Sequence, residues 1–397
     1  MDEVLPVVEV GPVAHGGHCV ARLDGQVVFV RHTLPGEQVR IRVTEDAGRY
    51  LRADAVEVLR AADGRVTPPC PVAGTCGGCD FQHVDPAVQR RLLGDVVQEQ
   101  LRRLAGIDRE VVVEEVLPVL GWRTRMSWAV DPDGRPGLRR HRSHEVVPLE
   151  QCPIAHPDLP AVLGHRWTGQ GVDAVVTSVG QRLVAADAPV PHDLEVDVVA
   201  DADGRTTDGV ATLDELVHDR PFRVAGTGFW QVHPAAATTL VDAVLASAEV
   251  RPGDVVADLY AGVGLFTRFL AEAVGPDGSV VSVEADRTAS RLAHDDLADL
   301  SQVDVVPGTT ERALHSGRVA TADVVVLDPP RTGAKRAIPA IAALEPRRIV
   351  YVACDPAALA RDVSSLRARG YELSGLQAFA LFPMTHHVEC VATLDRA

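Results

Sequence analysis

The sequence has almost no lysine and few aromatic residues. Lys335 is the single lysine among 39 basic side chains, and aromatic residues make up 4% of the chain. Arginine therefore carries nearly all of the positive charge, and the position of each arginine says more about phosphate binding than their number. The formal net charge of −16 excludes a chain that is basic over its whole surface and leaves room only for a local basic patch.

Long hydrophobic runs are also missing. No apolar segment approaches the roughly 20 residues that a membrane-spanning helix needs. The N-terminal stretch "MDEVLPVVEV" is acidic and lacks the basic start and apolar core of a signal peptide. We therefore expect a cytoplasmic protein with no membrane partner that works as a monomer. Its 397 residues, 46% of them hydrophobic, suit two or three domains with a sizeable core.

The pattern of residues divides the chain into three parts. Short apolar runs between Gly, Pro and Asp turn signals over 1–62 predict a small β-barrel of the OB type. In the second part, 63–221, spacing of three and four predicts a helix over 86–106, followed by short strands, so we expect an α+β domain. From 222 to 397, strands and helices alternate, which predicts an α/β, Rossmann-like domain with a parallel sheet covered on both faces.

The first strand of that third part leads into a glycine turn, "DVVADLYAGVGLF" (254–266). Gly262 and Gly264 let the backbone approach a ligand, and later strands end at Glu284 and Asp328 on the edge where open parallel sheets bind ligands. A dinucleotide site would need a third glycine where Thr267 stands. The pattern, with its "DPPR" segment, favours S-adenosylmethionine.

Two further residues at this edge could do chemistry. Cys354 follows the strand in "YVACDP", and Glu389 lies between apolar strands in "FPMTHHVEC". A cysteine can act as a nucleophile if its surroundings lower the thiol pKa, and a buried carboxylate can act as a base. We expect these two residues to form the catalytic pair.

Four other cysteines form a separate pattern: Cys70, Cys76, Cys79 and Cys152. Cytoplasmic disulfides are rare, and no thioredoxin-like pattern surrounds the Cys-x-x-Cys pair. Four thiolates suit either zinc or an iron–sulfur cluster, and the spacing alone does not choose between them.

A local basic patch is present after all. Residues 122–144 hold six arginines against two aspartates, with Trp122 and Trp128 among them. Arginine next to aromatic residues suits phosphate contact and base stacking. The arginines expected to bind RNA are Arg123, Arg125, Arg139, Arg140 and Arg142.

Several of these segments together resemble one known family. "DLYAGVG", "DPPR", "YVACDP" and "FPMTHHVE" are similar, in order and spacing, to the signature segments of S-adenosylmethionine-dependent RNA uridine-5-methyltransferases. "GFWQVHP" (228–234) resembles the segment that precedes the family's catalytic domain. "HTLPGEQV" (32–39) and its surroundings resemble the TRAM domain, and "CGGCDFQH" with "GLRRHRSHEVVPLEQCPI" resembles the central domain.

The resemblance implies a class I methyltransferase domain with defined roles for its residues. Cys354 would be the nucleophile and Glu389 the general base. The cofactor contacts would be Gln231, Tyr260, Gly262, Gly264, Glu284 and Asp328. The four clustered cysteines would hold a [4Fe–4S] cluster.

The implied reaction is methylation of uridine C5 in RNA through a covalent cysteine adduct at C6, with the base flipped out of its stack. Large-subunit (23S) ribosomal RNA is the favoured substrate and transfer RNA the alternative. A different possibility is an RNA-binding iron–sulfur protein whose methyltransferase fold is not catalytic. Three positions depart from the family pattern: Asp355 stands where Asn is common, Ala261 where Cys is common, and Leu265 where Asn is common.

Overall fold

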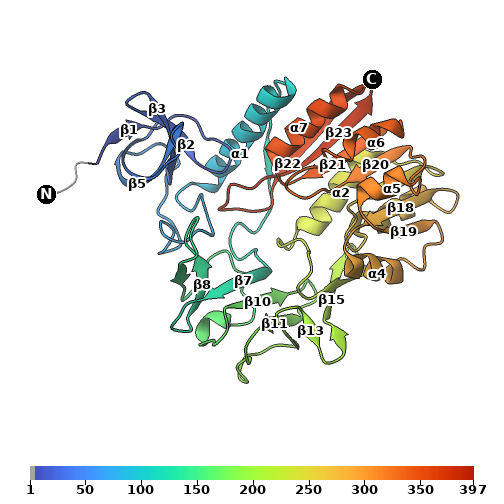
Figure 1. Ribbon diagram of the computed structural model, residues 1–397, viewed down its shortest axis with the longest axis horizontal. Helices are drawn as coiled ribbons and strands as arrows, with labels where there is room; N and C mark the ends of the chain where they lie inside the picture. Colours follow the sequence, from blue (N-terminus) through green and yellow to red (C-terminus); the bar gives the residue numbers. More distant parts are fainter. Residues whose placement is uncertain (1–4) are drawn as a thin grey trace.

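The structure, a computed structural model, describes residues 5–397. A β-barrel, a middle sheet and a larger α/β unit follow one another along the chain (Figure 1). In the view of Figure 1 the barrel lies beside helix α1 (Pro86–Gln100), and the α/β unit lies on the other side of that helix. Within 5–397, no helix combines the length and the apolar character needed to cross a bilayer.

The barrel contains five short strands: β1 (Val7–Glu9), β2 (Cys19–Leu23), β3 (Gln26–Arg31), β4 (Gln38–Asp46) and β5 (Tyr50–Arg60). They are ordered β1-β4-β5-β3-β2. The two edges meet beyond β1, where Gly11 N donates to Val20 O at 2.7 Å and Val20 N donates to Pro12 O at 2.9 Å. This contact closes the sheet, as the pattern of short runs predicted.

The middle part contains a six-stranded sheet in the order β12-β11-β10-β7-β8-β9. Its strands are β7 (Arg125–Val130), β8 (Pro136–Arg139), β9 (Val146–Pro148), β10 (Gly171–Val176), β11 (Arg182–Ala186) and β12 (Val198–Ala200). A one-turn helix, η2 (Val162–Gly164), and two small hairpins complete it: β13 (Arg205–Thr206) with β14 (Gly209–Val210), and β15 (Thr212–Val217) with β16 (Arg220–Ala225).

The α/β unit is built on an eight-stranded sheet in the order β19-β18-β17-β20-β21-β23-β22-β6. Five neighbouring strands of this sheet are parallel to one another: β17 (Val255–Leu259), β18 (Ser279–Glu284), β19 (Val303–Pro307), β20 (Val324–Leu327) and β21 (Arg348–Ala353). β23 (Glu389–Arg396) then pairs antiparallel with both β21 and β22 (Tyr371–Ala380). The hairpin expected at the C-terminus is therefore confirmed, and it brings the start of β23 to the carboxyl ends of the parallel strands.

Helices cover both faces of this sheet: α2 (Ala236–Ala248), α3 (Leu265–Val274), α4 (Arg287–Asp296), α5 (Thr310–His315), α6 (Ile338–Ala343) and α7 (Pro356–Arg367). Alternate residues of one strand serve different cores. Ile349 and Tyr351 of β21 join the core under α6 and α7, whereas Val350 and Val352 join the core under α2 and α3. Burial on both faces explains why these strands are continuous apolar runs rather than alternating ones.

One strand of this sheet comes from the middle part of the sequence. β6 (Val113–Glu115) pairs with β22 through Val113 and Ala378. Helix α1 precedes β6 and continues as a π-helical turn, η1 (Leu101–Ala105), that ends at Gly106 in the left-handed conformation. Arg367 of α7 donates to Ala105 O at 2.7 Å, so the helix is attached to the α/β unit. The segment 86–115 thus lies in the range expected for the middle domain but packs with the third.

Candidate active site

The catalytic pair predicted from the sequence is brought together by strand register. Ala353 of β21 lies opposite Cys390 of β23. Because the two strands are antiparallel, the next residues outward, Cys354 and Glu389, face each other at the same edge of the sheet. Asp328 follows the neighbouring strand β20 and reaches the same place.

Cys354, Glu389 and Asp328 lie close enough for their charges to shift one another's pKa values. Burial, and then the negative charges of Glu389 and Asp328, raise the pKa of the Cys354 thiol from 9.0 to about 11. Burial and Asp328 also raise the pKa of Glu389 well above its usual range. Arg331 opposes both shifts. The requirement that the surroundings lower the pKa of Cys354 is therefore not met by the protein alone, because burial and two acids outweigh one exposed arginine.

The cofactor crevice lies two strands away, where β17 meets its glycine turn. Asp258, 1% exposed, accepts a hydrogen bond from Thr267 Oγ1 at 2.5 Å, and the same hydroxyl lies 2.9 Å from Ser282 Oγ. Thr267 occupies the position where a dinucleotide-binding fold would need its third glycine, which allows the helix to pack closely on the strand. Here the hydroxyl group of Thr267 joins α3 to β17 and β18 through hydrogen bonds instead. Burial raises the pKa of Asp258 to about 7, and its Oδ1 atom is buried without a partner.

The turn after β17 leaves room for a ligand. Tyr260, Gly262 and Gly264 all have positive φ, at 63°, 59° and 85°. For Tyr260 this conformation costs on the order of 1–3 kcal/mol, which is typical of residues held in place at a binding site. A Cβ added to Gly262 would meet nothing within 4 Å.

Glu284 closes the crevice at the end of β18. Its Oε2 atom accepts from Gly262 N at 2.8 Å and its Oε1 atom accepts from Asp286 N at 2.5 Å. Each carboxylate oxygen has a second lone pair, so Glu284 can still accept from a hydroxyl group. An unpartnered buried carboxylate oxygen, an open glycine turn and this free acceptor capacity fit a nucleoside cofactor.

Gln231, expected to contact the cofactor, and two of the departures from the family pattern, Ala261 and Leu265, have the following surroundings. Gln231 is buried in the segment between β16 and α2. Ala261 donates its N–H to Val283 O at 3.0 Å, and Leu265 begins α3 and packs in the apolar core. Leu265 therefore offers the crevice no polar group.

The four clustered cysteines come from distant segments to one neighbourhood. Burial is the main cause that raises the pKa values of Cys76 and Cys79. The charges of neighbouring cysteines raise them further: Cys152 and Cys70 act on Cys76, and Cys152 and Cys76 act on Cys79. Gly78 N donates to Cys76 Sγ at 3.4 Å. All four are free thiols. Among residues 5–397, however, no group of three or more Cys, His, Asp or Glu side chains is arranged to hold a metal ion.

The five arginines expected to contact RNA fall into two groups. Arg125 is only 10% exposed and donates to Gly226 O and Gly228 O at 3.1 and 3.2 Å, so it holds the chain together instead of facing solvent. Arg123 is partly buried and lies close enough to Cys152 and Cys79 to feel their charges. Arg139, Arg140 and Arg142 remain at the surface, the last two paired with Glu145 and Glu45.

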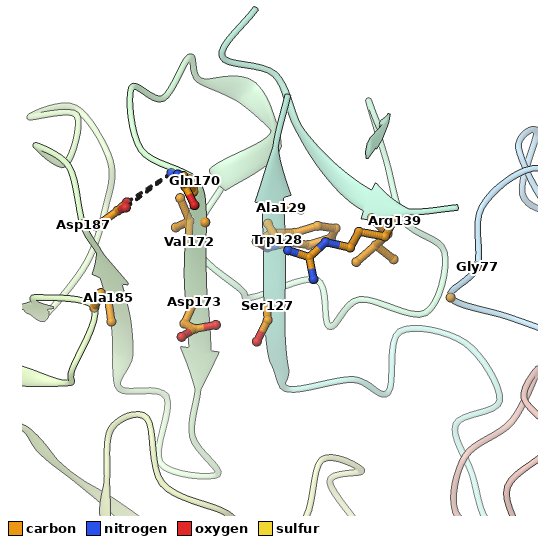
Figure 2. A pocket seen from close by; sticks show the side chains of 14 residues that line it. Gly77, Ser127, Trp128, Ala129, Arg139, Gln170, Val172, Asp173, Ala185 and Asp187 are labelled. Atoms are coloured by element: carbon orange, nitrogen blue, oxygen red, sulfur yellow. Dashed lines mark hydrogen bonds between the residues drawn. The ribbon is translucent and has the colours of Figure 1, made fainter. Parts of the chain in front are cut away.

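The tryptophans in that stretch are not free to stack on bases. Trp122 and Trp128 are 1% and 4% exposed, and Trp122 stacks on His233 with ring centroids 6.0 Å apart. The stretch contributes a cavity instead. Figure 2 shows Arg139 reaching toward Trp128 among the lining residues, with Ser127 and Asp173 on the adjacent strands and Gly77 of the cysteine loop on the other side of Arg139. Its volume is about 510 Å³, and Cys354 and Glu389 do not line it.

Sequence reasoning missed three groups at the site. Arg331 stands within the "DPPR" segment without an expected role, although its charge acts on both Cys354 and Glu389. Asp80 Oδ2 lies 2.6 Å from His386 Nδ1, and His15 Nε2 lies 3.1 Å from Asp355 Oδ2. The last two pairs are separated by more than 300 residues in the chain, so no local pattern could reveal them.

The α/β unit has the fold of a class I methyltransferase, with a glycine turn at the carboxyl ends of its parallel strands. Residues 7–56 match the TRAM domain, and residues 316–397 match the tRNA (Uracil-5-)-methyltransferase family. The chain is 48% identical to an uncharacterized RNA methyltransferase of Streptomyces avermitilis, over 98% of each sequence. It is 36% identical to one of Bifidobacterium longum, over 96% of this chain and 95% of the relative.

A solved structure shares the fold over the whole length. The Pyrococcus abyssi tRNA (uracil-54, C5)-methyltransferase in complex with S-adenosyl-L-homocysteine superposes with a TM-score of 0.72 at 20% identity, covering 98% of this chain and 100% of that one. The chain belongs to the RNA uracil-5-methyltransferase family. It is an RNA methyltransferase, and the family resemblance seen in the sequence is confirmed.

Proposed function

We propose that this enzyme methylates C5 of a uridine in RNA through a covalent intermediate on Cys354. The observation that carries the proposal is the pairing of Ala353 with Cys390, which sets Cys354 beside Glu389 at the cofactor edge. Uracil C5 is a poor nucleophile, and a two-step route through a cysteine adduct removes that difficulty.

In the first step the Cys354 thiol would lose its proton to solvent as its sulfur adds to C6 of the uracil, and the C5–C6 π electrons would move onto the C4 carbonyl oxygen. C5 of the enolate would then bond to the methyl group that S-adenosylmethionine supplies, and the electron pair of the broken S–CH3 bond would stay on the sulfur of the departing cofactor. Glu389 removes the proton from C5, the C6–S bond breaks, and the thiolate leaves 5-methyluridine as product. A stacked base cannot reach a site at the sheet edge, so the uridine is flipped out.

The pKa values of Asp328 and Glu389 are raised in the site without substrates. The pKa of Asp328 is raised to about 7 by burial and by Asp258, and that of Glu389 is raised as well. A raised pKa makes the carboxylate of Glu389 a stronger base toward the C5 proton. We infer that Cys354 loses its proton only when substrates are bound. Gln231, Tyr260, Gly262, Gly264, Glu284 and Asp328 would hold the cofactor.

We also propose that Cys70, Cys76, Cys79 and Cys152 hold a [4Fe–4S] cluster. The proposal is supported by four free thiols whose charges act on one another and by the N–H donors of Gly78 and Gln82 at the sulfur atoms of Cys76 and Cys79. In the described residues 5–397 these thiols are not yet arranged around a metal, so the cluster would have to draw them together. The cluster would organise the middle domain, since Cys354 supplies the reacting thiol.

The proposed domains are 1–62, 63–221 and 222–397, with the first two binding RNA. We favour large-subunit ribosomal RNA as the substrate, because the resemblance combines a TRAM domain with the cysteine pattern. The name of the Pyrococcus abyssi relative favours transfer RNA as the second candidate. We place the reaction in the cytoplasm, on a monomer.

The test is transfer of a labelled methyl group to RNA from a strain that lacks the protein, followed by mapping of 5-methyluridine. Cys354→Ala should abolish methylation, while Cys390→Ala, which removes a buried thiol next to the site, should keep it. Full activity of Cys354→Ala would exclude the covalent route. No transfer by the wild-type protein to any RNA would support a non-catalytic RNA-binding protein.

A further inference from the structure

The loop between β1 and β2 of the barrel reaches the methyltransferase unit. It folds as a tight turn in which Ala14 N donates to His18 O at 2.7 Å and Gly17 N donates to Ala14 O at 3.2 Å. Gly16 and Gly17 have φ of 94° and 77°. The turn presents His15 and Gly17 outward, away from the barrel core.

His15 contacts the residue that directly follows the proposed nucleophile. Its Nε2 atom lies 3.1 Å from Asp355 Oδ2, with the two side chains 39% and 23% exposed. The other oxygen of Asp355 caps helix α7 by accepting from Ala358 N at 2.7 Å. His15 and Ala358 hold the pKa of Asp355 low, so the carboxylate is ionised and His15 must be the donor.

Gly17 contacts the segment that leads to the proposed base. A Cβ at Gly17 would lie 2.9 Å from His386 Cβ and 3.1 Å from Asp80 Cβ, so only glycine fits. Asp80 Oδ2 in turn accepts from His386 Nδ1 at 2.6 Å and from His386 N at 3.2 Å. His386 lies three residues before Glu389.

We propose that the 14–18 turn of the barrel is part of the support of the active site, and that His15 is a positioning residue for Cys354. It acts through Asp355, whose two hydrogen bonds fix the backbone between Cys354 and α7. The barrel thus contributes to the chemical step in addition to any contact with RNA. This inference rests on the proposed nucleophilic role of Cys354.

The pair also gives the departure at position 355 a physical meaning. An ionised Asp355 binds a histidine donor more strongly than the neutral amide of Asn would, because a charged acceptor strengthens the bond. The carboxylate is matched to a histidine that comes from another domain.

The experiment compares His15→Ala, His15→Gln and wild type on RNA from a strain lacking the protein. His192→Ala removes an exposed histidine of the middle domain and serves as the control. We expect His15→Ala to lower kcat about three- to tenfold and to leave KM for RNA within about twofold. The partly exposed His15–Asp355 pair should affect the orientation of Cys354 more than the affinity for RNA. His15→Gln keeps a donor for Asp355 and should recover most of kcat.

A second measurement separates positioning from folding and from RNA binding. The rate of adduct formation at saturating RNA carrying 5-fluorouridine, whose C5 fluorine cannot leave as a proton, should fall by the same factor in His15→Ala. In an Asp355→Asn background the His15→Ala change should have little further effect. Wild-type kcat in His15→Ala, or a loss confined to KM, would overturn the inference while leaving the proposed function intact. Activity of Cys354→Ala would instead remove the proposed function itself.

Discussion

The pKa of Cys354 leads to a quantitative prediction for the free enzyme. At pH 8 a thiol of pKa about 11 is about 0.1% ionised, against about 10% for one of pKa 9.0. Only the thiolate is alkylated, so Cys354 should react with iodoacetamide roughly 100-fold more slowly than an exposed cysteine at that pH. That ratio corresponds to about 2.7 kcal/mol in the cost of forming the thiolate.

Two substitutions should move this reactivity in opposite directions. Glu389→Gln removes a buried negative charge, so the midpoint of the Cys354 alkylation profile should fall by about one pH unit. Arg331→Gln removes the cation that opposes the rise, so the midpoint should increase. Arg331 is exposed and its field is screened by water, so its effect should be the smaller of the two.

The assay is alkylation between pH 7 and 11, followed residue by residue with peptide mass spectrometry because the chain has seven cysteines. Cys390, fully buried in β23, serves as an internal control that should react only when the protein unfolds. A Cys354 midpoint below pH 9, or a lower midpoint in Arg331→Gln, would refute this electrostatic account of the site.

Three further predictions concern the base, the cysteines and the RNA surface. Glu389→Gln should form the covalent RNA adduct but release methylated RNA at least about 100-fold more slowly. Gel electrophoresis of the denatured complex would show the trapped adduct, and rapid release would mean that another residue is the base. Protein purified without oxygen should be brown, and Cys152→Ser should lose both the absorbance near about 400 nm and thermal stability; a colourless wild type containing stoichiometric zinc contradicts the cluster. Arg139→Ala should weaken RNA binding and reduce the salt dependence by about one counterion, whereas Arg125→Ala should mainly destabilise the fold; equal effects of the two on RNA affinity alone would count against this division.

The sequence determined the architecture of the α/β unit because the relevant signals are local. Apolar runs that end in Asp258, Glu284, Asp328 or Cys354 define parallel strands and name the residues at their carboxyl ends. Parallel strands share one binding edge, so this periodicity was enough to predict which side chains meet. The same holds for the helix ending at Gly106, since its apolar spacing and C-cap are contained in one segment.

Only the tertiary structure decided which arginines and tryptophans face solvent. Arg125 and Arg139 lie in one basic stretch, yet one donates to buried carbonyl groups and the other lines an open cavity. Alternation along β7 and β8 and the packing of distant segments decide this difference, and composition does not record it.

The pairing of groups across the domains was likewise beyond the sequence. The proposed catalytic residues Cys354 and Glu389 could be chosen from their motifs, because strand ends and apolar surroundings mark them. Their electrostatic balance and their supports could not, because Arg331, His15 and Asp80 act through space on Cys354, Asp355 and His386. A sequence specifies which chemical groups exist and where each strand ends, whereas charge interactions and hydrogen bonds depend on distances of a few ångströms that exist only once the three parts have packed together.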